Sequence, residues 1–178
     1  MSEQPSRYTR SFSGMTGALI VTVLVVVAFV AWRGLFRTDT DDTPEAVDWQ
    51  ESVELAQQAD LAVVRPRELP AGWTATSVDL VAGDDPRWGL GVLTDEGRFV
   101  GIRQQDASVI ELVETYVDEK AEEGEDATVE SEVADTWQTW TDDGGDHGYT
   151  TELGDDALLV YGSAPVEDIE TFMGLLTR

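Results

Sequence analysis

An uncharged run from Gly14 to Trp32 constrains this chain more than any other feature of its sequence. At a helical rise of about 1.5 Å per residue, the run would span roughly 28 Å, close to the hydrocarbon thickness of a bilayer. Its polar side chains, Thr16 and Thr22, carry hydroxyls that can bond back to their own helix. The sequence therefore predicts a transmembrane helix at 14–32, followed by one hydrophilic domain.

The orientation of this helix does not follow from its flanking charges, because two arginines precede it and two follow it. A short N-terminal tail is typical of an uncleaved signal-anchor, and an acidic domain suits the outer face better than the anionic inner leaflet. We expect a cytoplasmic tail at 1–13 and a single-pass protein of the cell membrane with its domain outside. A cleaved signal peptide ending near Val26-Val27-Ala28 is the alternative, although the apolar run continues past that point.

The domain after the predicted helix is strongly acidic. From Thr38 onward the chain has 35 acidic and seven basic residues, which gives a formal charge of −28. Such a surface repels phosphate groups, so nucleic acid is not expected as a partner. The sequence contains no Cys, which excludes disulfides and thiolate metal sites. After an acidic linker at 33–47, the remaining length fits one domain at 48–178.

The first elements of this domain can be predicted from capping residues and apolar spacing. Asp48 and Glu51 have the spacing of a capping box, and apolar residues then recur on one helical face, which predicts a helix over 49–59. The pair Val63–Val64 indicates a short strand, which Pro66 is expected to stop.

Two similar series of elements follow. Apolar alternation predicts strands at 74–80, 88–92 and 98–104, and then a helix that is capped by Ser108 and Glu111 and ends at Gly124. The second series comprises a helix from Pro165 and strands at 129–133, 137–141, 149–153 and 157–162. Strands followed by a helix thus occur twice, at roughly 74–123 and 127–177, which suggests a pseudo-twofold arrangement. The predicted fold class is α+β, with an antiparallel sheet and helices packed on one face.

The loop Asp142–Gly148 (DDGGDHG) is a candidate cation site, since Asp142, Asp143, Asp146 and His147 could ligate a hard cation such as calcium. Its spacing does not match the EF-hand loop, because Gly occupies the third position and no Glu occupies the twelfth. We therefore favour a solvated hairpin loop over a metal site.

Catalytic signatures are absent from the sequence. His147 is the one His, and a zinc enzyme or a Ser-His-Asp triad would have to use it, but neither HExxH nor GxSxG occurs. The nearest serine, Ser163, precedes the last helix and is predicted to cap it. We assign no catalytic, cofactor-binding or metal residues and expect no cofactor. Four acidic residues lie near the end of the helix predicted in the first series. We interpret them as a solvated surface: Glu122, Glu123, Glu125 and Asp126.

Four tryptophans lie in or beside the predicted strands: Trp73, Trp88, Trp137 and Trp140. Exposed on a sheet, they would form a platform for sugars. Buried, they would fill the core of a small domain, and the large area that a Trp side chain buries favours this second interpretation.

Three runs resemble an actinobacterial family of single-pass membrane proteins classed as a domain of unknown function. These are LPAGWTATS at 69–77, WGLGVLT at 88–94 with Gly97, and VGIRQ at 100–104. The resemblance extends from the predicted span to the C-terminus. It implies a short cytoplasmic tail, one span and an exported domain, and it supplies no catalytic residues.

We expect a membrane-anchored, extracytoplasmic module of the cell envelope that contacts a protein or a glycan without catalysis, because the domain offers surface and no recognisable active site. The alternative is a carboxylate-dependent hydrolase that acts on cell-wall glycan. The two differ in structure: the enzyme needs two carboxylates facing one cleft, whereas a binding module would show a shallow apolar patch on an open sheet face.

Overall fold

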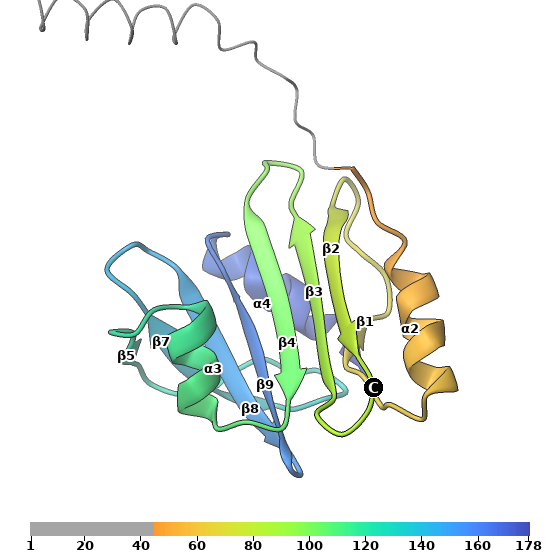
Figure 1. Ribbon diagram of the computed structural model, residues 1–178. Coiled ribbons are helices and arrows are strands. Elements are labelled where there is room, and N and C mark those ends of the chain that lie inside the picture. Colours follow the sequence, from red (N-terminus) through yellow and green to blue (C-terminus); the bar gives the residue numbers. More distant parts are fainter. Residues whose placement is uncertain (1–44) are drawn as a thin grey trace, which may run out of the picture. The chain divides into compact units, whose positions relative to one another are not determined.

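The computed structural model describes residues 45–178, which belong to one compact unit (Figure 1). The predicted cytoplasmic tail at 1–13, the transmembrane helix at 14–32 and most of the linker at 33–47 lie outside the described residues. Within the part that is described, no helix has the length and apolarity needed to cross a membrane.

An antiparallel sheet of eight strands forms the centre of the domain, in the order β2-β3-β4-β9-β8-β7-β5, with β6 paired to β7. Its strands are β2 (Thr74–Val81), β3 (Arg87–Leu93), β4 (Phe99–Gln105), β5 (Glu122–Glu123), β6 (Ala127–Thr128), β7 (Thr136–Thr141), β8 (His147–Leu153) and β9 (Asp156–Gly162). A separate two-stranded sheet pairs β1 (Arg65–Pro66) with β10 (Leu176–Thr177). The six long strands confirm the expectations from apolar alternation.

The structure describes three helices: α2 (Trp49–Gln58), α3 (Val109–Tyr116) and α4 (Val166–Gly174). The carboxylate of Asp48 accepts hydrogen bonds from the first-turn amides of α2, and the hydroxyl of Ser108 accepts one from the amide of Glu111 in α3. Side-chain caps of this kind satisfy amides that have no partner within the helix. Both predicted N-termini are confirmed.

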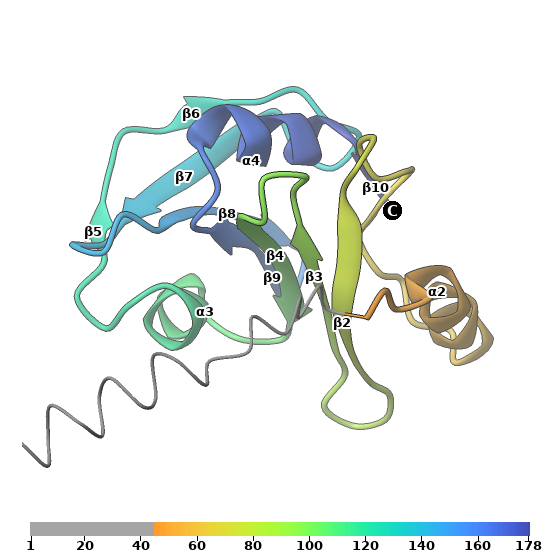
Figure 2. The same ribbon diagram turned by 90° about the horizontal axis from the view of Figure 1, so that it is seen from above.

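The prediction that all helices pack on one face is wrong. In Figures 1 and 2, α3 and α4 lie on opposite sides of the sheet. Leu158 and Val160 of β9 share a buried cluster with α2 and α4, while the alternate residues Ala157 and Leu159 share another with α3. The sequence of β9 is a continuous apolar run, so its side chains on both faces of the sheet are apolar. Each face must therefore be covered by other elements.

The two halves of the sheet meet where β4 pairs with β9. Each half has three long consecutive antiparallel strands followed by a helix, so the predicted order of strands before a helix is confirmed, although four strands were predicted for the second half. The two helices nevertheless cover opposite faces, so a twofold axis perpendicular to the sheet does not relate the halves. The two halves repeat the order of their strands and helix along the chain, but not their arrangement in space.

The segment before β2 differs from its prediction. Val63 and Val64 are buried but do not form a strand. Pro66, which was predicted to end that strand, instead belongs to β1. Proline lacks a backbone N–H but is tolerated on an edge strand, where that donor is not needed. Leu176 was predicted to lie in the last helix, but it is part of β10 in this short sheet.

The segment between α3 and β7 also differs. The helix ends at Tyr116, so Gly124 is not its C-cap, and the amide of Lys120 donates to the Asp118 carboxylate in the turn that follows. The strand expected at 129–133 is displaced to β6, because the Ser131 hydroxyl accepts from the next amides and forms a turn. The N-cap of α4 is Pro165 and not Ser163.

Candidate functional site

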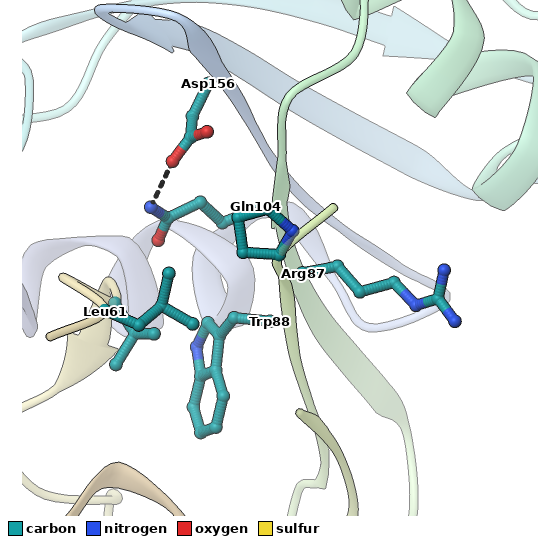
Figure 3. Close-up of a pocket in the computed structure, with 7 residues that line it drawn as sticks. Leu61, Arg87, Trp88, Gln104 and Asp156 are labelled. Atoms are coloured by element: carbon teal, nitrogen blue, oxygen red, sulfur yellow. Dashed lines mark hydrogen bonds between the residues drawn. The ribbon is translucent and has the colours of Figure 1, made fainter. Parts of the chain in front are cut away.

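The recess in Figure 3 is held together by the amide of Gln104. The Gln104 Oε1 accepts from the amide of Val64 at 2.8 Å, and its Nε2 donates to the carbonyl of Ala62 at 3.0 Å and to the carboxylate of Asp156 at 2.7 Å. The indole N–H of Trp88 donates to the Val64 carbonyl at 2.8 Å. With a volume of about 10 Å³ the recess has room for about one water molecule, so its role is structural.

The tryptophans belong to the core. Trp88, Trp137 and Trp140 are buried, and Trp73 stacks on Phe172 of α4 with a centroid distance of 6.3 Å. The core interpretation is confirmed, and Trp88, Trp137 and Trp140 are too deeply buried to form a sugar-binding platform.

The loop between β7 and β8 is closed by its own first residue. The Asp142 carboxylate accepts from the amide of Asp146 at 2.7 Å, and Gly145 adopts a positive φ of 90° in the turn. His147 lies in β8, opposite Thr141 and Gly162, and is not part of the loop. In residues 45–178, no group of three or more His, Asp or Glu side chains is placed to hold a metal ion.

The carboxylates of the described residues do not form the pair that the alternative hydrolase would need at the two hollows beside them. The recess of Figure 3 is lined by one carboxylate, Asp156, whereas glycoside hydrolysis needs two that face one cleft. Glu114 and Glu119 line an open hollow beside α3, but both are exposed to solvent. The four acidic residues interpreted as a solvated surface are exposed as expected, although two of them form β5 and do not end a helix.

The sheet has one face that is only partly covered. In Figures 1 and 2, α3 lies over β8 and β9, and none of the helices described for residues 45–178 lies over β2, β3 and β4 on that side. We call this surface the open face. The strand register places on it the residues Ser77, Asp79, Gly89, Gly91, Leu93, Phe99, Gly101 and Arg103.

Glycines form the floor of the open face. A Cβ on Gly101 would lie 2.7 Å from the ring of Tyr161 and 2.9 Å from that of Phe99, and a Cβ on Gly89 would overlap the guanidinium of Arg103. These side chains therefore lie flat against the sheet backbone. Glycine weakens a strand, and its use here is explained by this close approach.

Arg103 is held in place across the open face. Its Nη1 lies 2.9 Å from the Asp79 carboxylate, and its guanidinium carbon lies 4.7 Å from the centre of the Tyr116 ring. Burial lowers the pKa of Arg103, but its contacts with Tyr161, Tyr116 and Asp79 raise that pKa above the ordinary value. The guanidinium is a fixed positive charge with 22% of its side chain exposed.

Three aromatic rings border this arginine. Phe99 and Tyr161 meet edge to face at 5.6 Å, and Tyr116 packs on Tyr161 at 5.7 Å. All three are partly exposed. The open face is thus a flat surface of aromatic rings and one oriented guanidinium, which can make apolar, stacking and charge-assisted contacts.

These residues were not predicted as a site from the sequence. A usable signal was present: glycines at alternate positions of β3 and again in β4 leave one side of two adjacent strands without side chains. The shallow, partly apolar patch that was expected of a binding module is found on the open face.

Fold and surface together define an α+β domain with an antiparallel sheet, three described helices and an open sheet face. The sequence profile of a family described as "Protein of unknown function (DUF4245)" matches residues 7–176, and the chain belongs to this family. The resemblance to a family of unknown function is confirmed in this respect.

No curated protein matches this chain. Among solved structures three chains match, and one is in the "Crystal structure of MucB in complex with MucA(peri)". That chain is 14% identical over 66% of this protein, with a TM-score of 0.36. The match spans 36% of its length, about a third, and an overlay this weak carries no information on function.

Proposed function

We propose that this protein is a non-catalytic binding module of the cell envelope. A transmembrane helix at 14–32 anchors it, with the tail in the cytoplasm and the domain outside. The open face of β2, β3 and β4 receives a partner protein. The observation that carries this proposal is the flat, partly exposed layer of Phe99, Tyr116, Tyr161 and Arg103 on a floor of glycines.

The shape and composition of the open face favour a protein as the partner. Small molecules bind mainly in concave pockets, whereas this surface is flat. Tyr, Phe and Arg are enriched in protein interfaces and supply many of their strongest contacts. Arg103 is already fixed by Asp79 and Tyr116, so its ordering on binding costs little side-chain entropy.

Site-specific crosslinking tests the face. Because the chain has no Cys, Ser77→Cys introduces one thiol on the open face for a photocrosslinker. In intact producing cells, a crosslinker at position 77 should yield a discrete adduct, and Leu93→Lys on the same face should reduce its yield about tenfold or more. Thr171→Cys, at an exposed position of α4, is the matched control and should not give this adduct. The same adduct from position 171, or an unchanged yield with Leu93→Lys, would rule out the face.

The same variant tests the orientation. A membrane-impermeant maleimide added to intact cells should label Ser77→Cys, and labelling only after lysis would place the domain inside. This outcome is separate from the crosslinking result, so anchor topology and binding surface are judged independently.

A further inference from the structure

A second surface lies away from the open face, in the groove between α2 and β1. The groove has a volume of about 230 Å³. Trp49 and Val53 of α2 lie at its base and are only 8% and 6% exposed, and Arg65 and Arg67 of β1 line it on the other side. Since alternate residues of a strand point the same way, both arginines face the groove while Pro66 between them is buried.

The two arginines differ in what they contact. Arg67 is ion-paired with Glu132 at 3.2 Å and donates to the carbonyl of Gly174 at 3.4 Å. Arg65 is partly buried, and within residues 45–178 neither an ion pair nor a hydrogen bond engages its guanidinium. Its planar set of N–H donors is therefore available to a ligand, and such a set matches a carboxylate with two parallel bonds.

Arg65 differs in this from the arginines of the central sheet. Arg87 and Arg103 are close to Asp79, and Arg98 donates to the carbonyl of Ser163. Arg178, the last residue, is exposed and has no ion pair within residues 45–178. An unengaged guanidinium beside a second arginine is the local feature that attracts an anion. The surrounding −28 charge and Glu54 on the groove wall disfavour a polyanion, so the complementary ligand carries a single negative charge.

We propose that this groove binds the C-terminal carboxylate of a peptide. Arg65 would receive the carboxylate, and the exposed side-chain amides of Gln50 and Gln57 would bond to peptide backbone groups. Only the small exposed edges of Trp49 and Val53 would lie beneath the peptide. The proposal does not depend on the open face, which lies on β2, β3 and β4.

Peptide titration of the full-length chain tests the groove. The probe is the tripeptide acetyl-Gly-Leu-Val with a free carboxylate, followed through the indole N–H resonance of Trp49, which Trp49→Phe assigns. We expect a saturable shift. The C-terminally amidated tripeptide and Arg65→Gln should each weaken binding about tenfold or more, because each removes a charge-assisted pair.

Lys120→Gln is the matched control, because it removes an equal charge from an exposed position beyond α3 and should leave binding unchanged. Thermal melting of Arg65→Gln shows whether that variant keeps the fold. Equal shifts with the amidated peptide would overturn the proposal. Binding that survives Arg65→Gln would overturn it too. So would the absence of a saturable shift at about 10 mM peptide, or equal shifts with inorganic phosphate.

Discussion

At the scale of single residues, Gly162 has the least tolerance for a side chain. A Cβ there would overlap the carbonyl oxygen of Phe99 and lie 3.1 Å from the Cα of Val100, and backbone atoms cannot rotate away as a side chain can. Gly162→Ala should lower the free energy of unfolding by roughly 2–3 kcal/mol, measured by urea denaturation. Gly174→Ala is the control, because its nearest contact is 3.9 Å away and it should cost little. Equal losses for both would contradict this packing argument.

Tyr149 makes the stability sensitive to alkaline pH. Burial, reinforced by the charge and hydrogen bond of Glu170, raises the pKa of Tyr149 to about 12. The ordinary pKa of a tyrosine is about 10. Between about pH 10 and 12 the unfolded chain therefore loses this proton while the folded chain keeps it. The free energy of unfolding should therefore fall as the pH rises, by at most about 2.7 kcal/mol.

Tyr149→Phe provides the test. Its unfolding free energy, measured at intervals across this pH range, should fall by less than that of the native chain, since Phe has no proton to lose. Tyr161→Phe, which changes a partly exposed ring on the open face, should retain the native slope. Parallel curves for Tyr149→Phe and the native chain would contradict the assignment.

At the scale of elements, Gln104 connects β4 to the segment before β1 and to β9. Gln104→Met keeps much of the side-chain volume but leaves the amide of Val64, which is buried, without its acceptor. It should cost roughly 2–4 kcal/mol of stability in urea denaturation. The neighbouring Gln105→Met removes a partly exposed amide on the other face and should change stability by about 0.5 kcal/mol or less. Similar costs at both positions would show that Gln104 is not the connection.

The sequence was sufficient for elements whose signal is local. Alternation located the six long strands, and the side chains of Asp48 and Ser108 located two helix starts. It was insufficient between α3 and β7, where the side chains of Asp118 and Ser131 accept hydrogen bonds from nearby amides and so compete with regular structure. The pairing of β1 with β10 was also missed, because it joins residues more than a hundred positions apart.

A surface like the open face could be predicted from the sequence, but its position on the sheet could not. A shallow patch was expected, and the alternate glycines of β3 mark strands that other groups approach closely. Which half of the sheet α3 covers depends on long-range packing of Leu112 and Val113 against β9, and no local pattern encodes that choice. The tryptophans could be assigned to the core from their size alone, and the structure confirms it.

At the scale of the whole molecule, charge is the dominant feature. The domain from Thr38 carries −28, and within residues 45–178 the carboxylates that form ion pairs are those of Asp79 and Glu132. Most acidic side chains therefore repel one another without local compensation. Unfolding expands the chain and relieves this repulsion, so the folded state is destabilised when salt is low.

Added salt should raise the melting temperature for this reason. Screening shortens the range of charge repulsion from about 30 Å at 0.01 M to about 3 Å at 1 M ionic strength. Each exposed pair contributes only a few tenths of a kcal/mol, but the pairs are many, so sodium chloride should raise the Tm by several degrees (about 4–8 °C per kcal/mol for a small domain). Magnesium chloride at matched ionic strength is the control, because a far larger rise with magnesium would indicate specific binding by carboxylates. A Tm that does not respond to either salt would mean that the acidic side chains are neutralised by nearby positive charges. That result would contradict the small number of ion pairs seen in residues 45–178.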